Sequence, residues 1–188
     1  STDEWRRAWA AHLGLVNLAD AGIGRVLNAL EASPHADDTA VFFMSDHGDH
    51  LGQHCMYQKM EMYEQAVRVP MILRVPGGAV GEVDAPVSHL DIMPTILELM
   101  GIDASEDLDG SSLLNCLRTG ESPPDRPQYS AFSGNPTIGD LRRAVITRRH
   151  KYIHDPDDIP ELYDLDADPL EMQNIAADPS HAEIVREL

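Results

Sequence analysis

Residues 39–49 read TAVFFMSDHGD, an apolar run that ends in a cluster of polar residues. The apolar part, 39–44, shows no alternation of apolar and polar side chains, which predicts a strand buried on both faces, as in a parallel sheet. Ligands of open parallel α/β sheets bind beyond the carboxyl ends of the strands. Asp46 and His47 directly follow this strand, so the sequence predicts a site at these two residues.

Asp46 and His47 have side chains that suit a divalent metal ion, a carboxylate beside an imidazole. Gly48 would then let the backbone turn sharply after them. The alternative is a solvated polar loop, and a strand followed by Asp-His-Gly does not by itself decide between the two interpretations.

The sequence on either side predicts further helices and strands. Apolar residues recur at helical spacing over 5–32, which predicts a long amphipathic helix that ends at the Ser-Pro pair 33–34. A second apolar run, 71–75, predicts a second buried strand. Asp91 is the predicted N-cap of a further helix, and Gly101 its C-terminal stop.

The chain changes character near residue 105. Short strands or helices are predicted at 111–117, 128–132, 141–147, 151–154 and 180–188. We therefore predict an α/β part over residues 1–104 and a small antiparallel α+β subdomain over residues 105–188.

Charge and composition narrow the class of protein. The 188 residues carry a formal net charge of −18 at pH 7, which repels nucleic acid and anionic lipid. No apolar run reaches the roughly 18 residues of a membrane span, so we expect neither nucleic acid nor membrane as a partner. Any anion site needs local positive charge, and the only lysines are Lys59 and Lys151. Cys55 and Cys116 lack the spacing of a disulfide framework or a zinc site, which predicts free thiols.

Residues 45–54 read SDHGDHLGQH and are followed by Lys59, by Tyr63-Glu64 and by VRVP at 67–70. This pattern closely resembles the sulfatase family of the alkaline-phosphatase superfamily. Further landmarks follow in family order at Asp20, 24–27, 87–95, 109–113, 151–153 and 161–174. The resemblance implies an α/β fold with part of an alkaline-phosphatase-like parallel sheet and its helices, followed by the small C-terminal subdomain.

The resemblance also implies roles for individual residues. Asp46 and His47 correspond to metal ligands, and the metal in the family is usually calcium, with manganese or magnesium as the other options. Lys59 corresponds to a catalytic and substrate-binding lysine that contacts a sulfate oxygen. A lysine ammonium is a compact charge with three donors, which suits developing anionic charge; the alternative for Lys59 is a solvated surface lysine. His54 corresponds to a position that either touches substrate or supports the loop by a hydrogen bond, and we favour support.

Two parts of the family's chemistry are not encoded in this chain. A cysteine or serine in a Cys-x-Pro-x-Arg-like motif becomes formylglycine; its hydrate attacks sulfur, the alcohol leaves and the hemiacetal collapses to release sulfate. An early Asp-Asp pair supplies two more metal ligands. Cys55 and Cys116 do not stand in such a motif, because the residues that follow them are MYQ and LRT.

We therefore predict a fragment of a sulfuric ester hydrolase that carries half of the metal and sulfate site, with an N-terminal part of the same protein as its partner. A nicked enzyme with a second chain is another explanation. A phosphate or phosphonate ester hydrolase of the same superfamily and a non-catalytic relative that binds sulfated ligands are the alternative functions. We expect no activity from this chain alone. The particular ester, the oligomeric state and the cellular compartment are left open.

Overall fold

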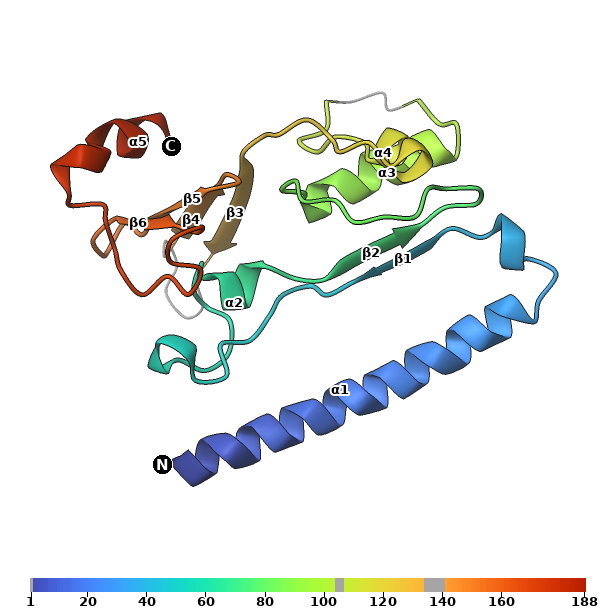
Figure 1. The fold of residues 1–188 in the computed structure, drawn as a ribbon, viewed down its shortest axis with the longest axis horizontal. Coiled ribbons are helices and arrows are strands. Elements are labelled where there is room, and N and C mark those ends of the chain that lie inside the picture. Colours follow the sequence, from blue (N-terminus) through green and yellow to red (C-terminus); the bar gives the residue numbers. More distant parts are fainter. Residues whose placement is uncertain (1, 104–106, 134–140) are drawn as a thin grey trace.

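The computed structural model describes residues 2–103, 107–133 and 141–188. The predicted boundary between residues 104 and 105 lies outside the described residues. Figure 1 shows a long helix along one side, a two-stranded ribbon in the middle and a separate four-stranded sheet beside the C-terminus. None of the helices in the described ranges combines the length and apolarity needed to cross a membrane.

The long helix, α1 (Thr2–Glu31), confirms the helix predicted at 5–32. None of its residues is buried, and apolar side chains such as Leu13 and Val26 are exposed. Trp9 joins the N-terminal part of α1 to the rest of the chain, because its Nε1–H donates to the carbonyl of Leu51 at 2.9 Å. The apolar surface of α1 therefore stays largely open in the part of the chain that the structure describes.

The two predicted apolar strands form as β1 (Val41–Met44) and β2 (Met71–Arg74). They pair with each other in antiparallel direction, so the parallel direction that the sequence predicts for this part is wrong for this pair. A continuous apolar run indicates a strand with apolar side chains on both faces. It carries no information about the direction of the neighbouring strand.

Burial on both faces is also wrong for these strands within the described residues. Phe43 is 36% exposed and Ile72 is 64% exposed. Both residues lie in the paired register, where Phe43 is opposite Ile72. α1 has no buried residue, so it does not pack over the ribbon. The side chains of Phe43 and Ile72 are therefore left uncovered.

Two short helices, α3 (Ile92–Leu99) and α4 (Leu114–Thr119), pack against each other beyond the ribbon. The predicted stop at Gly101 is confirmed, since this residue adopts φ +68°, a conformation that glycine tolerates best. The predicted capping by Asp91 is wrong in detail. Ser88 caps the turn at 89–91, and the Asp91 carboxylate reaches back to the Ser88 N–H at 2.9 Å.

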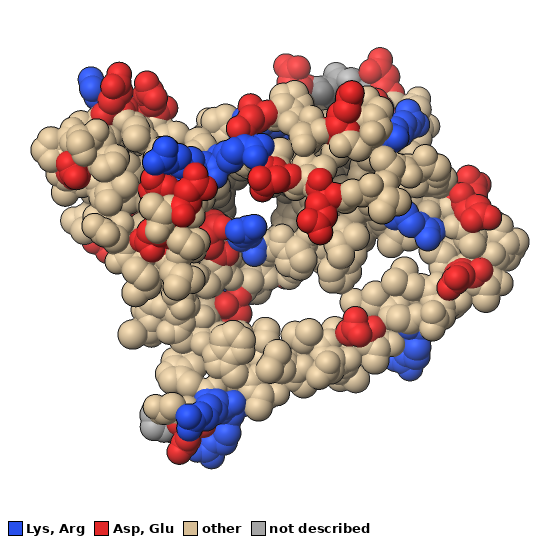
Figure 2. All heavy atoms as spheres, viewed as in Figure 1, with Lys and Arg blue, Asp and Glu red and all other residues tan. Residues whose placement is uncertain are grey.

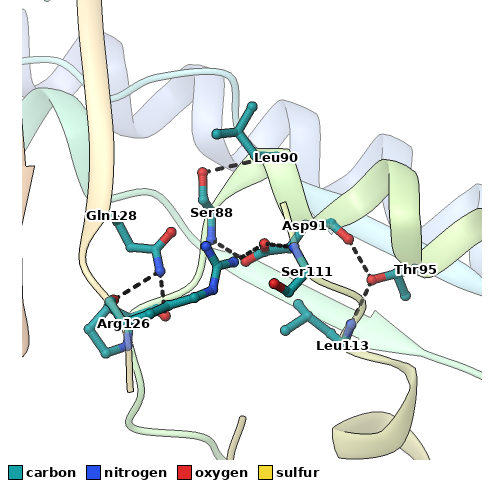
Figure 3. Close-up of polar contacts among 9 residues, drawn as sticks. Ser88, Leu90, Asp91, Thr95, Ser111, Leu113, Arg126 and Gln128 are labelled. Carbon is teal, nitrogen blue, oxygen red and sulfur yellow. Dashed lines mark hydrogen bonds and ion pairs between the residues drawn. The ribbon is translucent and has the colours of Figure 1, made fainter. Parts of the chain in front are cut away.

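Asp91 is instead the centre of a buried polar cluster (Figure 3). Its carboxylate accepts the N–H of Ser111 at 2.8 Å and pairs with the guanidinium of Arg126. Its carbonyl accepts the hydroxyl of Thr95, whose oxygen in turn accepts the N–H of Leu113 at 2.9 Å. One buried carboxylate thus ties the start of α3 to the loop before α4 and to the segment that leads to β3.

The C-terminal sheet confirms the predicted antiparallel subdomain. Its order is β3-β4-β5-β6, with every neighbouring pair antiparallel. The strands are β3 (Gln128–Ser133), β4 (Leu141–Ile146), β5 (His150–His154) and β6 (Glu161–Asp164). The last helix, α5 (Ala182–Glu187), confirms the one predicted at 180–188.

The core of this sheet includes a residue from far upstream. Ala144, Ile153 and Tyr163 form a buried cluster with Met62. Met62 precedes the short helix α2 (Glu64–Val67), so the segment that leads into α2 is packed onto the C-terminal sheet. The two predicted parts of the chain therefore share a core.

Candidate active site

The candidate site lies on the loop that leaves the carboxyl end of β1. The Asp46 carboxylate is fixed against its own backbone, because the N–H of His47 donates to Oδ1 at 2.9 Å. Ser45 steadies the same turn, since its hydroxyl donates to the carbonyl of His47 at 2.8 Å. The backbone hydrogen bond from His47 lowers the pKa of Asp46 below its usual range, so this carboxyl is charged at neutral pH.

The ring of His47 is oriented by a backbone carbonyl. Its Nδ1 lies 2.8 Å from the carbonyl oxygen of Gly48, and a carbonyl can only accept, so Nδ1 carries the proton. In the neutral tautomer with the proton on Nδ1, the other nitrogen, Nε2, is the acceptor of the ring. Nε2 lies 3.3 Å from Asp46 Oδ2 and contacts the Lys59 ammonium. A ligating histidine is commonly held in this way, with one N–H donated to a carbonyl and the other nitrogen directed at a cation.

Gly48 is required by a close approach. A Cβ at this position would lie 1.9 Å from the carbonyl oxygen of Gln65, and the Gly48 N–H donates to the carbonyl of Ala66 at 2.8 Å. The loop therefore packs directly on the backbone of α2. The sequence predicts a glycine here for a sharp turn. The structure gives the close approach to α2 as the reason for a glycine at this position.

Lys59 is brought to the same place from twelve residues along the chain. Its side chain is exposed, and its ammonium donates to Nε2 of His47. The structure therefore brings the three predicted residues Asp46, His47 and Lys59 together. Their roles as metal ligands and as a sulfate-binding lysine stay predictions.

His54 has a different setting. Its ring stacks on that of Tyr63, with centroids 3.9 Å apart and planes at 9°. Its backbone is left-handed at φ +53°, a conformation unusual for a residue other than glycine. These contacts favour loop support through aromatic stacking, whereas the sequence suggests support through a hydrogen bond. A catalytic role for His54 stays a prediction.

The donor set fits part of a divalent metal site. Asp46 offers carboxylate oxygens and His47 an imidazole nitrogen, which are ligands for calcium, manganese or magnesium to differing degrees. No group of three or more His, Cys, Asp or Glu side chains that could hold a metal occurs within residues 2–103, 107–133 and 141–188. The two residues therefore fit a metal as part of a larger shell.

The charge around the site makes local positive charge necessary. Figure 2 shows acidic side chains spread over the visible face, with basic side chains interspersed among them. The net charge of −18 opposes the approach of an anion. The Lys59 ammonium is the cation that the structure brings to His47, so it is suited to offset this field locally.

Sequence reasoning missed the residues that hold the segment after Lys59. Arg142 contacts Met60 and Glu61, and Lys151 contacts Glu64. One feature of the sequence could have pointed to Lys151, because it is one of only two lysines in an acidic chain. No sequence feature pointed to Arg142, because a single arginine at the start of a strand forms no pattern.

Comparison with known proteins now identifies the class. Residues 1–102 match the family described as "Sulfatase", and residues 52–188 match the one described as "N-sulphoglucosamine sulphohydrolase, C-terminal". The chain belongs to the sulfatase family of the alkaline-phosphatase superfamily. The predicted alkaline-phosphatase-like fold class is confirmed by the solved structures that it resembles.

Particular relatives show the range of the family. The chain is 34% identical to a choline-sulfatase of Rhizobium meliloti, over 93% of this chain and 34% of that protein. It resembles a solved structure in complex with its substrate D-glucosamine-2-N,6-O-disulfate, with a TM-score of 0.80 and 32% identity over 92% of this chain and 37% of the other. It also resembles the phosphonate monoester hydrolase of Agrobacterium radiobacter, with a TM-score of 0.78 and 30% identity over 89% and 37%. The chain thus spans about a third of the length of these relatives.

Proposed function

We propose that this chain supplies the metal-binding and sulfate-binding half of a sulfuric ester hydrolase. The observation that carries the proposal is the meeting of Asp46, His47 and Lys59 at the end of β1, in a chain of the sulfatase family. A carboxylate, a lone-pair nitrogen and an ammonium within reach of one another form a site for a metal ion and an oxyanion.

Each residue has a distinct part in this proposal. Asp46 and Nε2 of His47 hold the divalent metal, with calcium as our first choice and manganese or magnesium as the other options. The single lone pair of Nε2 then goes to the metal, which releases the Lys59 ammonium from its contact with His47. The bound metal would supply positive charge beside the sulfate group. The ammonium of Lys59 donates hydrogen bonds to a sulfate oxygen, whose negative charge increases as the ester bond breaks.

The remaining half of the site comes from protein outside this chain in our proposal. The relatives are about three times as long as the matched region. We propose that a segment of the same protein, N-terminal to the matched region, supplies an acidic pair as further metal ligands and a formylglycine nucleophile. This chain alone is then expected to be inactive.

A phosphate or phosphonate ester hydrolase is the second candidate function. The similarity to a phosphonate monoester hydrolase favours it, at 30% identity, and the metal ligands and Lys59 would serve either ester. A binding module for sulfated ligands without turnover is the third candidate, and it would keep Lys59 for anion binding alone.

The test compares ester classes on one protein. The parent protein that contains this chain and its upstream sequence is assayed with aryl sulfate, aryl phosphate and an aryl phosphonate monoester. We expect hydrolysis of the sulfate ester to have the highest kcat/KM, with a formylglycine detected upstream by mass spectrometry. A preference for the phosphonate ester with an unmodified nucleophile would favour the second candidate, and no turnover of any ester would favour the binding module.

A further inference from the structure

The segment that follows Lys59 is held by the C-terminal sheet. Met62 is 3% exposed and packs with Ala144, Ile153 and Tyr163 of that sheet. Lys59 itself is exposed, so its own packing does not fix its position. The position of its ammonium therefore depends on the backbone on either side, which the His50 N–H holds at the Gln58 carbonyl (2.8 Å) before Lys59 and the C-terminal sheet holds after it.

Arg142, the second residue of β4, makes polar contacts with the two residues that follow Lys59. Its Nη1 donates to the carbonyl of Met60 at 2.7 Å and to Oε1 of Glu61 at 2.8 Å. Its Nε donates to Oδ2 of Asp155, just beyond β5, at 2.6 Å. Arg142 thus joins the Met60–Glu61 peptide to a carboxylate just beyond the sheet, through hydrogen bonds that are charge-assisted on at least one side.

A buried ion cluster holds the other end of the same segment. The Lys151 ammonium, which is fully buried, lies 2.6 Å from Oε1 of Glu64 and 2.7 Å from Oε1 of Glu171. Glu171 also accepts the N–H of Glu64 at 2.6 Å. The hydroxyl of Tyr63 donates to Glu161 on β6 at 2.9 Å. Residues 60–64 are therefore attached to the sheet at both ends.

We propose that Arg142 is a positioning residue for Lys59. By fixing the Met60 carbonyl and the Glu61 carboxylate, it sets the backbone from which the Lys59 ammonium reaches Nε2 of His47. The importance of that position for the reaction rests on the proposed function, but the position itself does not. Arg142 acts through Lys59 and has no assigned contact with substrate.

The experiment observes Lys59 directly and needs no turnover. The chain has only two lysines, so lysine labelled with ¹³C at Cε gives two signals in a ¹H–¹³C NMR spectrum, and Lys59→Arg assigns them. The His47→Ala variant defines the signal of Lys59 without its partner. We expect Arg142→Ala to move the Lys59 signal most of the way toward the position seen in His47→Ala.

Two further variants keep the test decisive. Asp155→Asn weakens the hold on Arg142 from the far side and covers the case in which Arg142→Ala does not fold; it should move the Lys59 signal in the same direction by a smaller amount. Arg149→Ala removes an exposed arginine of the turn between β4 and β5 that pairs with Asp164, and it should leave the signal unchanged. The proposal is overturned if folded Arg142→Ala, or Asp155→Asn in its place, keeps the wild-type signal, or if Arg149→Ala moves it equally. Failure of sulfate ester hydrolysis would bear on the proposed function alone.

Discussion

At the scale of single residues, a short motif predicts the position of the candidate site but not the orientation of its side chains. The Asp-His-Gly run after β1 predicts a site at Asp46 and His47, and the structure places His47 in contact with both Asp46 and Lys59. The orientation of His47 was beyond sequence reasoning, because it depends on one hydrogen bond to the Gly48 carbonyl. Arg142 was missed because its partners, Met60 and Glu61, are distant in sequence.

Replacement of Gly48 tests the close approach of the loop to α2. We expect Gly48→Ala to lower the free energy of unfolding by about 1–3 kcal/mol, because its Cβ would overlap a backbone carbonyl and force the loop to shift. Urea denaturation measures this change. Gly81→Ala is the matched control, since a Cβ there meets nothing within 4 Å. Equal stability of the two variants would show that the loop accommodates a side chain at Gly48.

The pair of Asp164 and Arg149 predicts a pH dependence of stability. The hydrogen bond from Arg149 lowers the pKa of Asp164 from its ordinary value of 3.8 to about 2. A carboxyl with a lowered folded-state pKa stabilises the fold above its unfolded pKa, and this contribution is lost as the pH falls through the folded value. The stabilisation should therefore be complete above pH 3.8 and be lost toward pH 2.

Chemical denaturation over this pH range gives the measurement. The difference in unfolding free energy between wild type and Asp164→Asn should be largest above pH 3.8 and shrink toward pH 2. Arg149→Ala should weaken the same dependence, because it removes the largest cause of the lowered pKa and leaves the backbone hydrogen bonds from Asp166 and Ala167. A difference that stays constant over this range would contradict the assignment.

At the scale of helices and strands, position was predictable and pairing was not. Helical periodicity located α1, and the apolar runs located β1 and β2, because the spacing of apolar residues is a local pattern. The antiparallel pairing of β1 with β2 depends on the path of the intervening chain. The role of Asp91 was likewise hidden, since Ser111 and Arg126 reach it from 20 and 35 residues away.

Gly110 offers a test of the cluster around Asp91. A Cβ on Gly110 would lie 1.9 Å from the carbonyl oxygen of Leu90, so Gly110→Ala should push the Ser111 N–H away from the buried carboxylate. We expect a loss of about 1–3 kcal/mol in unfolding free energy, from overpacking and a weakened hydrogen bond. Thermal and urea unfolding measure the loss. Stability within about 0.5 kcal/mol of wild type, typical of neutral surface changes, would mean that the cluster tolerates this displacement.

On the scale of the whole molecule, the long helix α1 leaves much apolar surface exposed. Apolar side chains of α1 are exposed along its length, including Leu15, Leu18 and Val26, and soluble proteins rarely leave large contiguous apolar patches uncovered. The matched relatives are about three times as long as the region aligned. We expect further protein of the parent to cover this surface and to complete the site.

Metal binding by the chain alone tests that expectation. Calcium takes about 6–8 ligands, and Asp46 with His47 offers a small part of such a shell. We expect calorimetry to find binding at this site that is roughly millimolar or weaker, and Asp46→Ala to leave the residual binding by acidic loops unchanged. A micromolar site that disappears in Asp46→Ala would show that this half is complete without its partner.

The turnover of Lys59→Ala in the parent protein tests the proposed site most directly. We expect kcat for an aryl sulfate to fall about 10²–10³-fold, the usual loss when a donor to developing oxyanion charge is removed. The free energy of unfolding should change by no more than about 0.5 kcal/mol, since an exposed lysine contributes little to folding. Arg118→Ala, which removes an exposed cation on α4, should retain full turnover. A Lys59→Ala enzyme with kcat within about twofold of wild type would show that Lys59 is an ordinary surface residue.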